Sequence, residues 1–353
     1  MNLVKQWYHP QISISGNYEK KRNYFLDNLK FVLITFVVIC HFALKLTYVK
    51  EIKYILYLIY IFHMPCFIFI NGFFAKRMNT GGKLRVNRIF SVFWMYLLFK
   101  VGNVLLEYLF HQQVKLSLFK DVSAPWYLLA LCLWYLSVPC LERIKTEYLI
   151  LGSFLVGLFA GYIKSLGEIF SLSRVFVFFP FFIIGFCLTE DRLEKFLDKR
   201  LRLPALLFIV VVFSCLALFW KRLSPFISII YGSSPYSKSF GDIAKYGFLI
   251  RGIWYLFAVV LSVALMLLVP RCKMFFSSLG ERTLQVYMMH IWIRNALSYA
   301  GFFAIVKAGP AYYALLVFVG SIALTFLLAN RWLKKLFDFL MAPRLFDKLM
   351  KQD

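Results

Sequence analysis

Apolar runs of bilayer-spanning length recur along the whole sequence, and they constrain the fold more than any other feature. A membrane-spanning helix needs about 20 mostly apolar residues, and in lipid every backbone polar group must be satisfied internally. The sequence therefore predicts an all-α polytopic membrane protein. Ten runs can be delimited, at about 25–46, 54–75, 89–110, 126–141, 148–164, 174–190, 203–220, 247–269, 283–303 and 311–330.

The composition excludes a soluble domain. Of the 353 residues, 61% are hydrophobic and only 16% are charged, which is more apolar surface than a soluble domain of this size can bury. The net charge of +24 would indicate a nucleic-acid partner in a soluble protein. Here the basic residues lie between the apolar runs, as in loops that face anionic lipid, so no nucleic-acid partner is expected.

The distribution of basic residues predicts the topology. If the N-terminus is cytoplasmic, the inner segments hold 25 lysines and arginines and the outer loops hold 10. This bias follows the positive-inside rule along the whole chain, and it requires an even number of spans. Both termini are therefore expected in the cytoplasm.

The chain is expected to form one integral-membrane domain, residues 1–353. Residues 1–24 are a cytoplasmic N-terminal segment without the pattern of a cleavable signal peptide. Residues 331–353 alternate basic and apolar side chains and predict an interfacial helix on the inner leaflet. The seven cysteines lie outside the predicted outer loops and lack zinc-binding spacing, so neither a disulfide nor a metal site is expected.

Three ionisable residues stand in the first apolar run: Asp27, Lys30 and His41. Lys30 and His41 are eleven residues apart, so they project from one helical face, roughly 16 Å apart along the axis. Asp27 lies one turn before Lys30 and is expected to pair with it. Such groups are costly at membrane depth and are functional candidates. The alternative is a snorkelling Lys30 and a His41 that only bonds a neighbouring helix.

Two further histidines lie in predicted spans. His63 is expected at a depth similar to that of His41, so the two could share one cavity. His290 and Arg294 are four residues apart in the ninth run. Taken singly, each of these residues is better explained by hydrogen bonding or packing between helices than by catalysis.

Basic side chains gather where the third run begins. Lys83, Arg85 and Arg88 form a compact cluster, and the two arginines are neighbours on one helical face. Arginine forks at a helix start favour phosphate. The alternative is ordinary positive-inside charge, because every inner loop of this chain is basic.

Polar and aromatic residues also mark the outer helix ends. Trp126 and Tyr127 open the fourth run, where they fit either an interfacial aromatic belt or a stacking surface for a sugar ring. Arg174 and Arg251 lie at outer helix ends and are individually compatible with packing. Together these residues indicate a polar interior that is open to the outside.

The order of these motifs resembles the integral-membrane acyltransferase-3 family, and within it the polysaccharide O-acetyltransferases grouped with fucose 4-O-acetylase. The resemblance covers most of the chain. It rests on LDNLKFVLITFVVICH, with a basic residue eleven positions before a histidine, and on FHMPCFIFINGFF, RVNR, PWYLLAL, SRVFVFFPFFIIGF, YGSSPY and GERTLQVYMMH. Two departures are Lys30, where many members have arginine, and Asn71, where serine is frequent before Gly72.

The resemblance implies an O-acyltransferase of the bacterial inner (plasma) membrane that works without a metal. It would move an acetyl group from cytoplasmic acetyl-CoA to a hydroxyl of a surface or lipid-linked glycan. Lys30, Arg85 and Arg88 would bind the CoA phosphates, with Asp27 beside Lys30.

The resemblance also implies roles in catalysis. His41 would be the general base, since burial favours its neutral form, and His63 or His290 would assist it. The acceptor would be bound by four side chains, those of Trp126, Arg174, Arg251 and Tyr236.

Three alternatives remain open. A covalent acyl-histidine intermediate on His41 could replace direct attack by the acceptor. A transporter or flippase of a polar solute could use the same buried charges as a binding site and proton relay. A non-catalytic membrane scaffold would not need His41.

Overall fold

The computed structural model describes residues 23–114, 124–167 and 171–341. These residues are mainly helical, and a two-stranded sheet pairs β1 (Asn79–Thr80) antiparallel with β2 (Lys83–Leu84). Most of the predicted N-terminal segment and the end of the predicted tail lie outside the described residues.

A helix occupies each of the ten predicted apolar runs, as the all-α polytopic class requires. These helices are α1 (Tyr24–Ala43), α2 (Lys50–Ala75), α3 (Val86–Leu109), α4 (Trp126–Leu141), α5 (Thr146–Phe159), α6 (Leu172–Cys187), α8 (Arg202–Leu218), α11 (Gly247–Leu268), α12 (Thr283–Tyr299) and α14 (Ala311–Leu328).

Not all ten helices meet the length and hydropathy expected of a membrane span. Among the described residues, six helical segments do, built on α1, α2, α3, α8, α11 and α14. A seventh is added if α6 and α7 (Glu190–Phe196), which are bent by 105°, form one broken span. The helices α4, α5 and α12 have 16, 14 and 17 residues. The count of ten spans and the cytoplasmic termini stay predictions.

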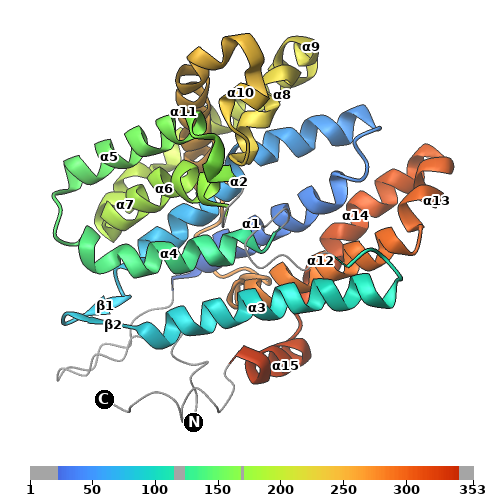
Figure 1. Ribbon diagram of the computed structural model, residues 1–353, viewed down its shortest axis with the longest axis horizontal. Helices are drawn as coiled ribbons and strands as arrows, with labels where there is room; N and C mark the ends of the chain where they lie inside the picture. Colours follow the sequence, from blue (N-terminus) through green and yellow to red (C-terminus); the bar gives the residue numbers. More distant parts are fainter. Residues whose placement is uncertain (1–22, 115–123, 168–170, 342–353) are drawn as a thin grey trace.

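The long helices run side by side between two opposite ends of the bundle (Figure 1). The β1–β2 hairpin lies at one end, which we call the hairpin end, and α13 (Phe302–Ala308) lies at the other. The loop charges predict that the hairpin end faces the cytoplasm. The amphipathic α15 (Arg331–Met341) lies beside α3, where the Trp94 indole donates to the Leu340 carbonyl at 3.0 Å.

Short helical turns join the long helices. Four of them build the predicted outer loop at 221–246: α9 (Trp220–Leu223), the 3₁₀ turn η5 (Ser224–Tyr231), α10 (Tyr236–Phe240) and η6 (Gly241–Tyr246). The others are η2 (Ala160–Tyr162), η3 (Lys164–Gly167), η4 (Lys199–Leu201) and η7 (Ser277–Glu281). The outer loop is therefore a structured surface loop, as its composition predicts.

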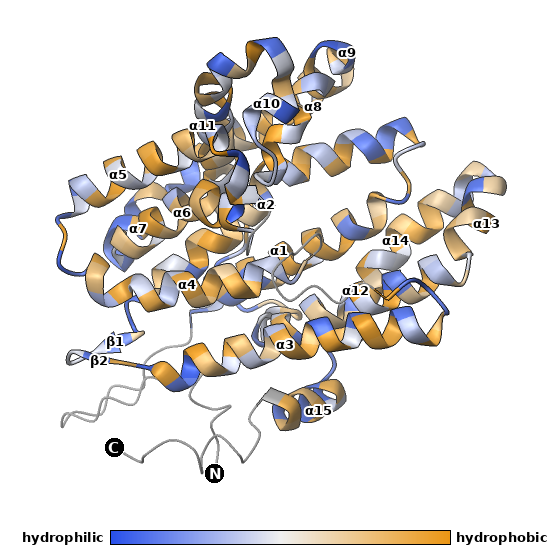
Figure 2. Cartoon of the chain, in the orientation of Figure 1, coloured by the Kyte–Doolittle hydropathy of each residue, from blue (hydrophilic) through white to orange (hydrophobic). Residues whose placement is uncertain are grey.

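The outward faces of the long helices are apolar. Figure 2 shows the helices mostly in orange and white, with blue concentrated at their ends and in the connecting segments. Large side chains are more than half exposed there, among them Leu105, Leu207, Leu256 and Leu316. Exposure of so continuous an apolar surface to water is unfavourable, whereas lipid chains solvate it.

Two glycines allow α2 and α6 to pack closely. A Cβ atom on Gly72 would overlap the Phe182 carbonyl of α6, and one on Gly185 would overlap the Phe69 carbonyl of α2. Small residues let helix backbones approach each other in membranes. Gly72 and Gly185 thus let α2 and α6 approach each other closely.

A proline fixes the contact between α2 and α11. Pro65 has no N–H, so the Ile61 carbonyl one turn earlier lacks its helical partner. The indole N–H of Trp254 on α11 donates to that carbonyl at 3.2 Å. This bond satisfies the carbonyl next to the turn that carries His63.

Candidate functional site

The rings of His41 and His290 meet inside the bundle. His41 lies in the last turn of α1 and His290 lies in the middle of α12. His41 Nδ1 and His290 Nε2 are 2.7 Å apart, and the ring centroids are 5.0 Å apart. His290 is fully buried, while His41 keeps partial exposure. Two of the three predicted catalytic residues are therefore in direct contact.

Hydrogen-bond chemistry assigns the tautomers of this pair. His290 Nδ1 is 2.7 Å from the Val286 carbonyl, which can only accept, so Nδ1 carries the proton. In a neutral ring His290 Nε2 is then the acceptor, and His41 Nδ1 donates to it. The remaining nitrogen, His41 Nε2, has a lone pair and no proton. This is the state that a general base or a nucleophile requires.

His63 uses the same anchoring contact. Its Nδ1 lies 2.9 Å from the Ile59 carbonyl one turn earlier, so Nδ1 donates and Nε2 keeps the lone pair. His63 is buried and interacts electrostatically with His41. All three predicted catalytic histidines thus lie in one region, which we call the histidine region (His41, His63 and His290). Within it, the ring that contacts His41 directly is that of His290.

Arg294 adds a fixed positive charge beside the histidines. It follows His290 by one turn of α12, and its Nε donates to Asn295 Oδ1 at 3.2 Å. It interacts electrostatically with His41, His290 and Tyr60. A guanidinium is a group that can stabilise negative charge developing in a neighbouring reacting group.

Aromatic rings lead from His63 towards the outer loop. Tyr60 lies edge-on to His63 and to Tyr231, with centroid distances of 4.9 and 5.3 Å. Burial raises the pKa of the Tyr231 phenol, which therefore stays protonated at neutral pH. Arg174 donates to the Tyr231 carbonyl at 3.3 Å and lies 5.4 Å from the Trp126 ring. The predicted acceptor residues Arg174 and Trp126 are thus linked to the histidines by contacts.

A second series of contacts returns from Trp126 to His290. The Trp126 and Tyr127 ring centroids are 6.0 Å apart, and Tyr127 lies 5.6 Å from Tyr287. Tyr287 is in turn 6.2 Å from His290. The amide of Asn71 donates to the Tyr127 hydroxyl. Sequence reasoning assigned no role to Asn71, although its position inside an apolar run was a signal.

The predicted basic residues gather at the hairpin end. Arg88 interacts electrostatically with Arg85 and Arg77. Arg77 and Lys30 lie over the same Phe74 ring, at 5.4 and 5.7 Å from its centroid. Cations from α1, from the turn after α2 and from the start of α3 therefore converge. Arg77 was not predicted as a site residue, although it lies in the same basic loop.

The start of α1 is held in place by its neighbours. Lys30 Nζ and Asp27 Oδ1 are 2.9 Å apart, which confirms the predicted ion pair. Between them, the fully buried Asn28 donates to the carbonyls of Pro270 and Cys272 at 2.9 and 3.0 Å. Asn28 thus fixes the position of the helix that carries both Lys30 and His41.

Arg251 and Tyr236, the other predicted acceptor residues, are buried in packing. The Arg251 guanidinium lies 4.7 Å from the Tyr236 ring centroid and donates to the Gly157 carbonyl at 3.3 Å. The Tyr236 hydroxyl donates to the Leu158 carbonyl at 2.7 Å. Their side chains are 1% and 0% exposed. These contacts hold the outer loop against the end of α5, and a role in acceptor binding stays a prediction.

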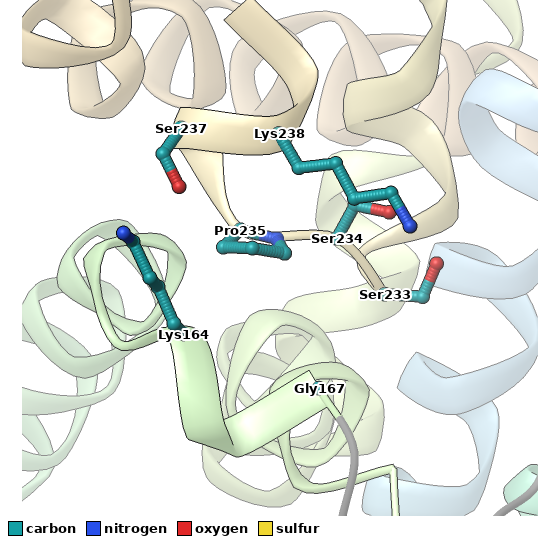
Figure 3. A pocket seen from close by; sticks show the side chains of 7 residues that line it. All are labelled: Lys164, Gly167, Ser233, Ser234, Pro235, Ser237 and Lys238. Atoms are coloured by element: carbon teal, nitrogen blue, oxygen red, sulfur yellow. The ribbon is translucent and has the colours of Figure 1, made fainter. Parts of the chain in front are cut away.

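A pocket of about 510 Å³ lies between η3 and the segment 233–238, which contains Tyr236 (Figure 3). None of the predicted catalytic, donor or acceptor residues lines it. The histidine region is the better candidate for chemistry, because a reacting group must be within hydrogen-bond reach of a base. Among the residues that the structure describes, no group of three or more histidine, cysteine or acidic side chains is placed to hold a metal ion.

Comparison with known proteins gives one match. A family model described as an acyltransferase domain, of the acyltransferase-3 type, matches residues 23–330. The matched range contains every residue of the histidine region and of the basic cluster. Searches of curated proteins and of solved structures found no match.

Proposed function

We infer the function of this chain from its family. The chain belongs to the acyltransferase-3 family, whose model matches residues 23–330. The chain is an acyltransferase with several helices able to span a membrane. In the proposed reaction it moves an acetyl group from cytoplasmic acetyl-CoA to a hydroxyl of a glycan on the other face of a bacterial inner membrane. The observation that carries this proposal is the hydrogen-bonded pair of His41 and His290, which leaves one unprotonated ring nitrogen available.

The basic cluster at the hairpin end is the proposed site for the donor. Acetyl-CoA carries several phosphate groups, and arginine binds phosphate with two parallel hydrogen bonds. Lys30, Arg77, Arg85 and Arg88 supply the positive charge there. Lys30 and His41 lie on one helix, so α1 connects the donor cluster with the base over roughly 16 Å.

His41 is the proposed general base. Its Nε2 takes the proton of the acceptor hydroxyl while the hydroxyl oxygen attacks the thioester carbonyl carbon. A C–O bond forms, the C–S bond then breaks, and the leaving thiolate takes the proton back from His41 Nε2. The products are the O-acetylated acceptor and free CoA, so atoms and charge balance. His290 holds the ring of His41 and stabilises its imidazolium through the Nδ1 bond.

Arg294 is the proposed electrostatic partner of the reaction. The thioester carbonyl oxygen gains negative charge when it is attacked, and a nearby guanidinium stabilises that charge in a site from which water is excluded. The acceptor is proposed to approach from the outer loop, along Trp126, Arg174 and Tyr231, because these residues connect that loop with the histidines.

The test uses the full-length protein in liposomes, labelled acetyl-CoA and a series of oligosaccharide acceptors. Label is expected in an acceptor, and His41→Ala should abolish the transfer. The matched control is His111→Asn, because His111 is exposed beyond the end of α3. Label on the protein without acceptor would support the acyl-histidine route. Uptake of a solute without acyl transfer would support the transporter instead.

A further inference from the structure

The pocket near the outer loop is lined by lysine, serine, glycine and proline residues. One wall is η3 with Lys164 and Gly167, and the other is the segment from Ser233 to Lys238. In Figure 3, Lys164 and Ser237 extend from opposite walls into the same space, and Lys238 extends along Ser234. A volume of about 510 Å³ is typical of sites that bind small molecules.

The charged side chains of the described lining are all positive. Among the described residues, two lysines and three serines line the pocket, and no carboxylate or aromatic ring does. Ammonium groups attract anions, and serine hydroxyls donate and accept hydrogen bonds as sugar hydroxyls do. A site for a neutral sugar would normally offer a ring face for stacking. The lining therefore fits a saccharide that carries an anionic group.

The backbone keeps the two walls close together. A Cβ atom on Gly167 would lie 2.8 Å from the Ser233 carbonyl oxygen, so only glycine allows this approach without a shift. Gly232, at φ +62°, turns the chain just before Ser233, and its carbonyl accepts a hydrogen bond from the Ser173 hydroxyl at 2.8 Å. The pocket is thus formed by two anchored segments.

The same segment connects the pocket with the histidines. Tyr231 precedes the pocket wall by two residues, and its ring packs against Tyr60, which packs against His63. Arg174 holds the Tyr231 carbonyl at 3.3 Å. A saccharide in the pocket would therefore be bound by the loop that borders the proposed acceptor path.

We infer that the pocket between Lys164 and Lys238 is a binding subsite for an acidic saccharide, whose carboxylate or phosphate groups are attracted by the ammonium groups of the two lysines at separate positions. The inference rests on the proposed function, since it names the class of acceptor that the enzyme would take. The lysines add affinity and select for charge, while His41 carries out the proton transfer at a separate position.

The test measures binding and transfer separately on the full-length protein in nanodiscs of neutral lipid. The probes are fluorescent tetragalacturonate, its methyl ester of equal length without charge, and a tetrasaccharide phosphorylated at its end. Tetragalacturonate or the phosphorylated probe should bind at least about tenfold more tightly than the ester, and added salt should weaken that preference. The probe that binds identifies the anionic group.

The variant is the double substitution Lys164→Gln and Lys238→Gln, which changes only exposed side chains. It should weaken binding of the acidic probe about three- to tenfold and leave the ester unchanged. The control is Lys221→Gln with Lys307→Gln, two lysines on the predicted outer side that do not line the pocket.

Equal affinity for the acidic probe and its ester, or no effect of the double substitution, would overturn the inference. The two proposals fail in different ways. If acidic probes bind through the lysines but receive no acetyl group, the proposed function is wrong and the binding subsite stands. If acetyl transfer proceeds without charge selection, only the subsite is wrong.

Discussion

His290 accepts a hydrogen bond from His41 while it donates one to the Val286 carbonyl of its own helix. The two bonds together fix which nitrogen of each ring carries a proton. They leave His41 Nε2 unprotonated without any carboxylate in the pair. A second histidine thus does what an acidic residue does in many catalytic triads.

Removal of the base should abolish acyl transfer. His41→Ala is expected to lower kcat by about 10²- to 10⁴-fold, since this is the usual contribution of a general base. The measurement is labelled acetyl transfer at equal amounts of folded protein, with His111→Asn as the control. Transfer at the wild-type rate would show that His41 is not the base.

Removal of the ring that holds His41 should lower the rate less. His290→Phe keeps an aromatic ring in the buried position but cannot accept the Nδ1–H of His41. We expect kcat to fall about 10- to 100-fold with little change in the KM for the acyl donor, because binding groups are untouched. Met289→Leu on the same helix is the control. A change in donor KM alone would contradict the assigned role.

The fold was largely predictable from the sequence because lipid imposes strong local rules. Each of the ten apolar runs contains a helix, since a run of spanning length leaves the backbone no other way to satisfy its polar groups. Whether the short helices α4, α5 and α12 cross the whole membrane could not be predicted, because the length that a span needs depends on its tilt and on neighbouring helices.

Loss of the arginines at the hairpin end should weaken donor binding. Arg85→Gln with Arg88→Gln is expected to raise the KM for acetyl-CoA about tenfold, with kcat nearly unchanged, because the phosphates remain bound equally in ground and transition states. Arg143→Gln, an exposed arginine of another inner loop, is the control. An unchanged KM would place the donor site elsewhere.

The bond between Trp254 and Ile61 should contribute to stability. Trp254→Phe leaves a buried carbonyl without a partner, which costs about 1–3 kcal/mol. Trp292→Phe is the matched control, because Trp292 Nε1 is buried and has no hydrogen-bond partner among the described residues. Thermal unfolding in detergent should show a larger loss for Trp254→Phe than for Trp292→Phe. The opposite order would contradict the role of Pro65.

The contact between α2 and α6 should be intolerant of a methyl group. Gly72→Ala would place a Cβ atom against the Phe182 carbonyl, so folded protein should be largely lost. Gly152→Ala, on α5 with nothing within 4 Å of the added atom, should be neutral or stabilising by up to about 1 kcal/mol. Size-exclusion profiles and thermal unfolding of both variants compare the two positions.

The candidate site was predictable in its members but not in its contacts. Sequence spacing places Lys30 and His41 on one face of α1, and it predicts the pair of Asp27 and Lys30, which the structure confirms. The contact of His41 with His290 spans 249 positions of the chain, and no local pattern encodes which of two buried histidines comes nearer. Arg77 could not be singled out, because every predicted inner loop carries basic residues.

The carbonyl of Val286 ends the hydrogen-bonded series that starts at His41, because a backbone oxygen can hold a proton donor but cannot pass a proton on. In the proposed reaction, a proton that His41 accepts at Nε2 would therefore have no onward route through His290. It would leave by the nitrogen through which it arrived. Such a reaction moves no proton through this pair, so we expect turnover to be independent of membrane voltage.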